Sequence, residues 1–222
     1  MHIVYLHGFA SSPQSGKAQF FKAKFEALGI PIAIPQLDRD DFERLTVSGM
    51  LDVTAAAVAN RPVILMGSSL GGFVAGLFAA RHPKLIQRLV LLAPALEFAE
   101  RWKQRFSTTE LAEWKRQGWK NFFHYGYKRE APLSYSFVED ALRYEGEPDF
   151  AQPALILHGT GDEVVPVALS RDYARRHANV TLKEFASGHE LTDVTEALWR
   201  ETTAFLGLAA EASPAPRRLT PE

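Results

Sequence analysis

The sequence of 222 residues contains no cysteine. This absence excludes disulfide bonds, thiolate nucleophiles and sites in which cysteine binds zinc or an iron–sulfur cluster. An excess of charge of one sign is also missing, since the formal net charge is -1 at pH 7. The charge balance therefore gives no reason to expect nucleic acid or an anionic lipid surface as a partner, and we expect a small molecule instead.

Long apolar runs are absent as well. No segment reaches the roughly 18 apolar residues that a membrane span needs, and the N-terminus has no basic region followed by an apolar stretch. None of the 7 histidines shows the H-x-x-x-H or H-E-x-x-H spacing of a metal site, and His158 is expected to brace backbone carbonyls. We therefore expect a cytoplasmic protein without membrane insertion or bound metal, long enough to bury a full core.

Short apolar runs alternate with stretches of helical periodicity, which is typical of parallel β–α–β units. We expect strands at residues 2–6, 32–34, 63–66, 89–92, 154–157 and 180–185. Helices are expected over residues 14–28, after a capping box at Asp40 and Glu43, over residues 70–82, and before Gly207. The predicted fold class is α/β, with a mostly parallel sheet of about six strands and helices on both faces.

One connection, from residue 94 to residue 152, is far longer than an ordinary loop. It holds 13 of the 25 aromatic residues of the chain: Phe98, Trp102, Phe106, Trp114, Trp119, Phe122, Phe123, Tyr125, Tyr127, Tyr135, Phe137, Tyr144 and Phe150. Some of them must form a satellite core, but such a set also walls an apolar pocket. We expect a helical lid at 94–152, a core made of residues 1–93 and 153–206, and a disordered tail at 207–222.

The segment GSSLG follows a buried strand and precedes a helix. This G-x-S-x-G pattern is typical of the nucleophile elbow, a tight turn that exposes a serine and needs residues without Cβ two positions to either side. The pattern makes Ser69 the candidate nucleophile, with Gly67 and Gly71 as the supporting glycines. Ser68 is a weaker candidate, because the same pattern centred on it would need glycines where the chain has methionine and leucine.

A serine nucleophile of this kind needs a base and an orienting acid, in the chain order Ser, Asp or Glu, His. Asp162 lies in a glycine-containing loop after one strand, and His189 lies in the turn before the last helix. We expect His189 to move the proton and Asp162 to hold the imidazole. Glu163 is the rival acid, although a carboxylate beside the acid more often caps a turn or faces water.

The first strand runs into the segment HGFASSPQSGK. A nucleotide-binding P-loop would need G-x-x-x-x-G-K-[ST], but Ser11 and Ala18 occupy two of the fixed positions. The pattern therefore disfavours a P-loop. We expect Lys17 to be a solvated helix residue, with Ser12 as the N-cap and Pro13 as the first residue of the helix.

The combination of the GSSLGG elbow, the opening YLHGF, SSP with a following Lys-Ala, IPQL, HGTGDEVVP and a late Gly-His resembles the small bacterial esterases of the α/β-hydrolase superfamily, whose relatives include acyl-protein thioesterase-like enzymes. The resemblance spans roughly residues 1–93 and 153–206. It implies the α/β-hydrolase fold, a Ser-His-Asp triad, no cofactor, and hydrolysis of carboxylic esters or thioesters. It also implies an oxyanion hole made by the backbone N–H groups of Phe9 and Leu70, with His7 and Gly8 forming the supporting turn.

The expected function is therefore that of a serine carboxylesterase that cleaves a small acyl ester of short to medium chain length. An acyl thioesterase and a lysophospholipase are alternatives that would use the same triad. A non-catalytic binding protein with the same fold is the alternative from another class. Gly188 stands where some relatives have an acidic residue, and this departure leaves the choice of substrate open.

Overall fold

The computed structural model describes residues 1–208, so most of the tail predicted at 207–222 lies outside the described part. The strands are β1 (Ile3–Leu6), β2 (Ile32–Ala33), β3 (Val63–Ser68), β4 (Ile86–Leu92), β5 (Trp119–His124), β6 (Arg129–Ser134), β7 (Ala154–Gly159) and β8 (Val180–Phe185). The α-helices are α1 (Gly16–Ala27), α2 (Val47–Val58), α3 (Leu70–Arg81), α4 (Phe98–Gln104), α5 (Thr108–Gln117), α6 (Ser136–Ala141), α7 (Val167–Arg176) and α8 (Thr195–Leu206). Two short 3-10 helices, η1 (Phe42–Arg44) and η2 (Thr192–Val194), complete this part of the chain. No helix within residues 1–208 is both long and apolar enough to cross a membrane.

Six strands form a parallel sheet in the order β2-β1-β3-β4-β7-β8. Every residue of β1, β3 and β7 is buried, as expected for central strands of a parallel sheet that is covered on both faces. The predicted fold class and the six predicted strands are confirmed, with small differences at the strand ends.

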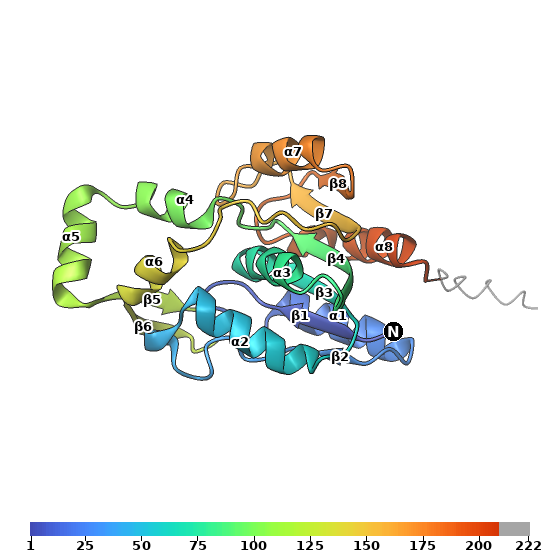
Figure 1. The fold of residues 1–222 in the computed structure, drawn as a ribbon, viewed down its shortest axis with the longest axis horizontal. Helices are drawn as coiled ribbons and strands as arrows, with labels where there is room; N and C mark the ends of the chain where they lie inside the picture. Colours follow the sequence, from blue (N-terminus) through green and yellow to red (C-terminus); the bar gives the residue numbers. More distant parts are fainter. Residues whose placement is uncertain (209–222) are drawn as a thin grey trace, which may run out of the picture.

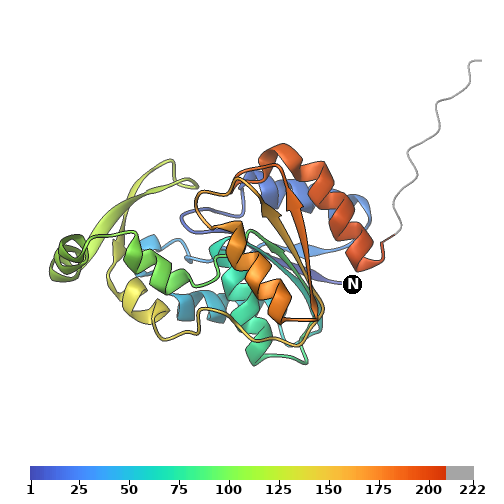
Figure 2. The ribbon, with the colours of Figure 1, turned by 90° about the horizontal axis from the view of Figure 1, so that it is seen from above.

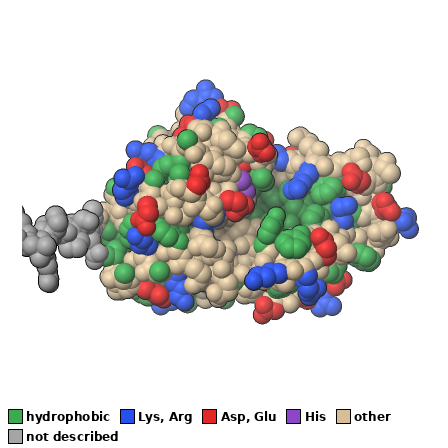
Figure 3. Space-filling model, turned by 180° about the vertical axis from the view of Figure 1, so that it is seen from behind, with side chains coloured by type: hydrophobic (Ala, Val, Ile, Leu, Met, Phe, Trp, Pro, Cys, Tyr) green, Lys and Arg blue, Asp and Glu red, His purple; other side chains and the backbone are tan. Residues whose placement is uncertain are grey.

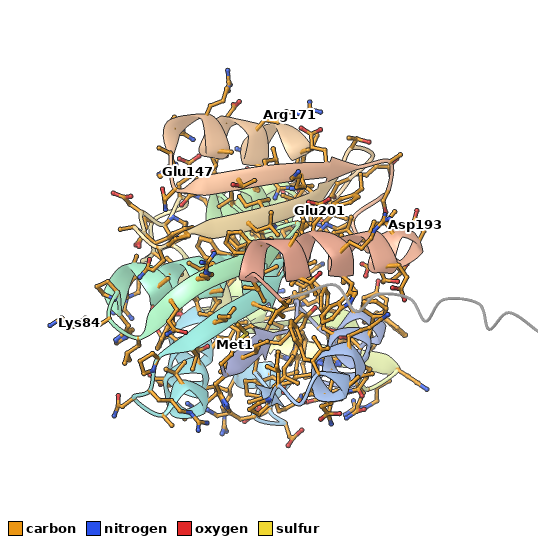
Figure 4. The ribbon with its side chains drawn as sticks, turned by 90° about the vertical axis from the view of Figure 1, so that its right-hand side faces the viewer. Met1, Lys84, Glu147, Arg171, Asp193 and Glu201 are labelled. Atoms are coloured by element: carbon orange, nitrogen blue, oxygen red, sulfur yellow. The ribbon has the colours of Figure 1, made fainter. Side chains whose placement is uncertain are left out.

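Helices cover both faces of this sheet, with α2, α3 and α7 on one side and α1 and α8 on the other (Figure 4). Successive residues of a strand point to opposite faces, so Leu65 joins the core under α3, and Met66 joins the core under α1 and α8. Helix α8 ends at Gly207, which has φ +69°, as the sequence predicted.

Residues 94–152, here called the insertion, project beyond one end of the sheet (Figures 1 and 2). They contain α4, α5, α6 and an antiparallel hairpin of β5 and β6. The sequence analysis predicted helices here but not the hairpin. The hairpin follows Gly118, whose φ of +85° ends α5 and turns the chain into the aromatic-rich strand β5.

One predicted helix start is wrong. Asp40 has φ +61° and does not cap a helix with Glu43. Helix α2 begins after Thr46 instead, whose side chain accepts a hydrogen bond of 2.9 Å from the N–H of Gly49. Short polar side chains stabilise turns and helix starts by the same bond to a nearby N–H, so the pattern alone could not separate the two.

The start of α1 also differs from the prediction. Ser12 accepts a bond of 3.2 Å from the N–H of Gln14 in a turn, and the helix begins after Ser15. Lys17 is not solvated: its side chain is only 9% exposed, and its Nζ lies 3.9 Å from the carboxylate of Glu190. Burial lowers the pKa of Lys17, and the nearby carboxylates only partly oppose that effect.

Candidate active site

Ser69 lies between β3 and α3 with φ +52° and ψ -117°. This conformation is strained for a residue with a Cβ and persists only when the surroundings hold it. The N–H of Ser69 donates to the carbonyl of Leu92 at 2.9 Å. Its own carbonyl accepts from the N–H groups of Phe73 at 3.1 Å and Ala95 at 3.0 Å. Both sides of the turn are therefore fixed by backbone hydrogen bonds.

The two glycines of the elbow allow very close backbone approaches. A Cβ at Gly67 would lie 2.3 Å from the carbonyl oxygen of Gly71. A Cβ at Gly71 would lie 2.2 Å from the carbonyl oxygen of Leu6 and 2.4 Å from that of His7. No side chain fits at these two positions, and this explains why the elbow pattern has glycine at both of them.

Ser69, His189 and Asp162 come together from three distant parts of the chain. Nε2 of His189 lies 3.0 Å from Oγ of Ser69, and its Nδ1 lies 2.7 Å from Oδ2 of Asp162. An ionised carboxylate only accepts hydrogen bonds, so Nδ1 carries the proton and Nε2 can accept from the serine. Glu163, the rival acid, is exposed, and Asp162 is the carboxylate that faces His189.

The carboxylate of Asp162 is fully buried and well supplied with donors. Oδ1 accepts from the N–H groups of Val164 at 2.8 Å and Val165 at 2.7 Å, while Oδ2 accepts from His158 at 3.1 Å and from His189. Burial alone would raise the pKa of Asp162, but these hydrogen bonds outweigh it and hold the pKa well below its usual value. Asp162 is therefore ionised beside His189.

His158 was not predicted as a site residue. Its Nε2 lies 2.9 Å from the carbonyl of Val165, as the expected backbone brace would, but also within reach of Asp162. Because a carbonyl only accepts, Nε2 carries the proton, and Nδ1 accepts from the hydroxyl of Ser170 at 2.8 Å. The available signal was its position four residues before Asp162, near the end of the strand that leads into the same loop.

The loop after β1 lies against the elbow, since a Cβ at Gly8 would be 3.6 Å from the Cβ of Ser69. His7 is buried, and its Nε2 accepts from the N–H of Leu37 at 3.3 Å. Nδ1 therefore carries the proton and donates to the carbonyl of Gly8 at 3.0 Å. Because the peptide unit is planar and trans, fixing this carbonyl also fixes the N–H of Phe9 on the opposite side.

Leu70 is the first residue of α3. The first N–H groups of a helix have no partner within it, and the helix dipole favours negative charge at this end. The two predicted oxyanion donors, Phe9 and Leu70, thus belong to segments that meet beside Ser69.

Figure 3 shows a hollow between the sheet domain and the insertion, with hydrophobic side chains over its floor and a histidine at its edge. Half-buried aromatic residues that pack on the core from the loop after β1 and from the insertion include Phe9, Trp102, Phe106, Phe122 and Tyr127. A cavity of about 10 Å³, lined in part by Phe9, Leu70 and His124, lies beside the expected oxyanion hole. A space of this size holds about one water molecule.

The insertion also contacts the loop that carries the acid. Arg101 of α4 donates a hydrogen bond to the carbonyl of Val164. Burial lowers the pKa of Arg101, which Asp162 partly opposes. Within residues 1–208, no cluster of three His, Asp or Glu side chains could hold a metal ion.

The chain matches the family described as Uncharacterised protein family (UPF0227) over residues 2–206. Its structure is similar to alpha/beta hydrolase domain-containing protein 10 from mouse, with a TM-score of 0.76, 22% identity, and coverage of 94% of this chain and 90% of that one. It is also similar to Est1E from Butyrivibrio proteoclasticus with ferulic acid bound, with a TM-score of 0.75, 20% identity, and coverage of 93% and 89%. The fold is therefore the α/β-hydrolase fold, as the resemblance implied.

A curated relative by sequence is a pimeloyl-[acyl-carrier protein] methyl ester esterase from Salmonella heidelberg. It is 32% identical over 108 residues, which make up 46% of this chain and 40% of that protein. The match spans less than half the length of that relative.

Proposed function

The chain belongs to the UPF0227 family, and from that premise we propose that this member is a serine hydrolase that cleaves carboxylic esters. The observation that carries the proposal is the pair of hydrogen bonds that joins Asp162 to His189 at 2.7 Å and His189 to Ser69 at 3.0 Å, with Ser69 on a strained elbow. A serine in this arrangement, next to N–H groups at a helix start, has what acyl transfer requires.

In the proposed reaction, Oγ of Ser69 attacks the carbonyl carbon of the ester while Nε2 of His189 takes the hydroxyl proton. The N–H groups of Phe9 and Leu70 bind the oxyanion of the tetrahedral intermediate. His189 then gives its proton to the leaving alcohol, and an acyl-enzyme remains. A water molecule then attacks the carbonyl carbon of the acyl-enzyme in the same way, and the carboxylic acid product is released. Asp162 stays ionised throughout and stabilises the imidazolium.

The substrate that we propose is a small ester with a short to medium acyl chain. The hydrophobic side chains over the hollow between the insertion and the rest of the protein favour an apolar acyl group (Figure 3). The name of the Salmonella relative, a methyl ester esterase, supports an ester as the substrate class.

Ser69→Ala tests the proposal directly. We expect this variant to lose hydrolysis of p-nitrophenyl butyrate and labelling by a fluorophosphonate probe while it keeps its fold by circular dichroism. Ser68→Ala is the matched control, because Ser68 is the neighbouring serine and is buried, whereas Ser69 is partly exposed, and the Ser68→Ala variant should still be labelled. Hydrolysis by Ser69→Ala, or labelling that depends on Ser68, would contradict the proposal. A wild-type protein that neither hydrolyses nor reacts would instead be a binding protein.

A panel of substrates then separates the remaining alternatives. We expect kcat/KM to be highest for p-nitrophenyl acetate or butyrate and to be lower for p-nitrophenyl dodecanoate. A higher kcat/KM for butyryl thioesters would favour a thioesterase, and a preference for lysophosphatidylcholine would favour a lysophospholipase.

A further inference from the structure

The turn between β5 and β6 lies directly on the loop that carries Phe9. The N–H of Tyr125 donates to the carbonyl of Ala10 at 2.8 Å. A Cβ at Gly126 would lie 2.8 Å from the Cβ of Ser12, so the two backbones approach closely. The tip of the hairpin is therefore in contact with the loop after β1, although the two are far apart in the sequence.

A buried carboxylate lies next to this contact. The side chain of Asp38 is 3% exposed. The hydroxyl of Tyr127, in the hairpin turn, donates to its Oδ2 at 2.8 Å. Its Oδ1 accepts from the side-chain amide of Gln36 at 2.6 Å and from the N–H of Asp40 at 3.1 Å. Nε2 of His124 lies 3.3 Å from Oδ2, and the ring of Tyr127 stacks on His124 with 3.7 Å between the centroids.

A buried carboxylate is costly to leave without donors, so Asp38 holds the hairpin turn through Tyr127. If the turn moved away, the carboxylate would lose a charge-assisted hydrogen bond in a place that water does not reach freely. The contact thus fixes the hairpin to the segment from Gln36 to Asp40.

The same segment is bonded to the predicted oxyanion loop. Leu37, next to Asp38, donates its N–H to Nε2 of His7 at 3.3 Å, and Nδ1 of His7 donates to the carbonyl of Gly8 at 3.0 Å. The planar peptide after Gly8 carries the N–H of Phe9. Asp38 is thus connected to this N–H through Leu37, His7 and Gly8 in turn.

The side chain of Phe9 makes a second contact with the insertion. Its ring lies 4.9 Å from that of Trp102, 5.6 Å from Phe122 and 5.7 Å from Phe137, centroid to centroid. Apolar contacts of this kind hold the position of the ring, but they do not set the orientation of the backbone N–H. The hydrogen bonds through His7 and Asp38 do so.

From these contacts we propose that Tyr127 and Asp38 are positioning residues for the reaction: they hold the N–H of Phe9 in the orientation that binds the oxyanion. This inference rests on the proposed function. Through Tyr127, the hairpin of the insertion would then affect the rate of the chemical step as well as the shape of the hollow.

Tyr127→Phe tests the inference, because it removes the hydroxyl and keeps the ring on His124. We expect kcat for p-nitrophenyl butyrate to fall about tenfold with KM within about twofold of wild type, since misplacing an oxyanion donor is a smaller loss than removing one. Tyr125→Phe is the matched control, because Tyr125 is 71% exposed in the same turn, and it should behave as wild type.

A second measurement separates positioning from loss of structure. An alkyl trifluoromethyl ketone adds to Oγ of Ser69, with the serine proton passing to His189, and the resulting hemiketal oxyanion lies where the ester oxyanion would. We expect Tyr127→Phe to weaken inhibition by this ketone about tenfold, and Asp38→Asn, which keeps an acceptor oxygen, to weaken it less. Inhibition by the matching methyl ketone, which reports ordinary binding, should not change.

Unchanged kcat and unchanged trifluoromethyl ketone inhibition in Tyr127→Phe would overturn the inference while the esterase proposal stands. An equal loss for both ketones would also overturn it, because that result shows a general change of the pocket. A wild-type protein without hydrolysis or fluorophosphonate labelling would overturn the proposed function and this inference together.

Discussion

Nε2 of His158 lies 3.1 Å from Oδ2 of Asp162, the oxygen that also accepts the hydrogen bond from His189. One carboxylate oxygen therefore faces two imidazoles, one buried and structural and the other next to the serine. The buried imidazole adds a donor that favours the ionised form of Asp162, and it also ties the acid loop to Val165 and Ser170.

Replacing His158 should change how the free energy of unfolding depends on pH under acid conditions. The pKa of Asp162 is depressed in the folded protein, so its contribution to the free energy of unfolding is present above the pKa of an unfolded aspartate, about 3.9, and is lost as pH falls toward the folded pKa. His158→Leu removes one donor, so the pKa of Asp162 should rise toward the unfolded value, and the loss below about pH 3.9 should be smaller than in wild type and end at a higher pH. We also expect about 1–3 kcal/mol of destabilisation at pH 7, because partners of His158 are left unpaired.

Urea unfolding of wild type and His158→Leu between pH 3 and pH 7 measures both effects. His82→Leu serves as control, since His82 is exposed. Curves of stability against pH that run parallel for wild type and His158→Leu would contradict the assigned role.

Gly71→Ala should prevent formation of the elbow. The added Cβ would lie 2.2 Å from a carbonyl oxygen of β1, and backbone cannot yield as a flexible side chain can. We expect a loss of at least about 3 kcal/mol in the free energy of unfolding, or no folded protein. Gly16→Ala is the control, because nothing lies within 4 Å of its added Cβ, and it should be neutral or slightly stabilising. A folded Gly71→Ala variant of wild-type stability would refute the packing argument.

Lys17→Met should not destabilise the protein at pH 7. Burial lowers the pKa of Lys17, so burying the charged lysine reduces the free energy of unfolding. This penalty is fully present below the folded pKa, and it disappears as pH rises past the unfolded pKa of about 10.4. Methionine keeps most of the buried side-chain volume without the charge. We expect Lys17→Met to be at least as stable as wild type at pH 7, with a smaller difference at pH 10.5, in urea unfolding. Lys22→Met, at a position that is 43% exposed, is the control. A decrease of more than about 1 kcal/mol in the free energy of unfolding of Lys17→Met would show that the charge of Lys17 stabilises the fold.

Asp140→Ala should loosen the insertion from the sheet domain. The carboxylate of Asp140, on α6, accepts from the N–H of Ser48 at 2.8 Å and from its hydroxyl at 2.5 Å, at the start of α2. Removing it leaves the N–H of Ser48 unpaired, while the hydroxyl of Ser48 keeps its bond of 2.6 Å to Tyr144, and should cost about 1–3 kcal/mol. Limited proteolysis should then cut the insertion faster than in wild type, whereas Asp149→Ala, at a side chain that is 92% exposed, should not change the rate. Equal rates of cleavage would mean that other contacts hold α6.

The sequence predicted the sheet and the grouping of Ser69, Asp162 and His189 for a simple physical reason. Parallel strands bring their carboxyl ends to one edge, so loops after β3, β7 and β8 meet there whatever lies between them. The glycine spacing of the elbow is a local pattern in the sequence, although only Gly67 has its close contact within the elbow; Gly71 lies against the end of the neighbouring strand β1. Such features depend on short-range periodicity, and the sequence displays it directly.

The remaining features depend on contacts that no local pattern encodes. Tyr127 contacts Asp38 only because the hairpin folds back over the loop after β1, and the sequence around either residue does not indicate the contact. Lys17 looks like a surface residue of a helix start, yet its side chain is only 9% exposed and lies 3.9 Å from Glu190, the residue after His189. The hairpin itself was hidden because its aromatic residues fit a buried helix as well as a strand.

The hydrogen bond from the N–H of Ala95 to the carbonyl of Ser69 has a consequence for exchanging insertions between relatives. The first residues after β4 belong structurally to the elbow, so an insertion taken from a relative and joined at residue 94 would replace a residue that holds the turn at Ser69. The N–H of Glu97 donates to the carbonyl of Gly146 at 2.7 Å, where the chain leaves and rejoins the sheet domain. Chimeras joined at Glu97 and Gly146 would exchange residues 97–146 and keep the recipient's own elbow.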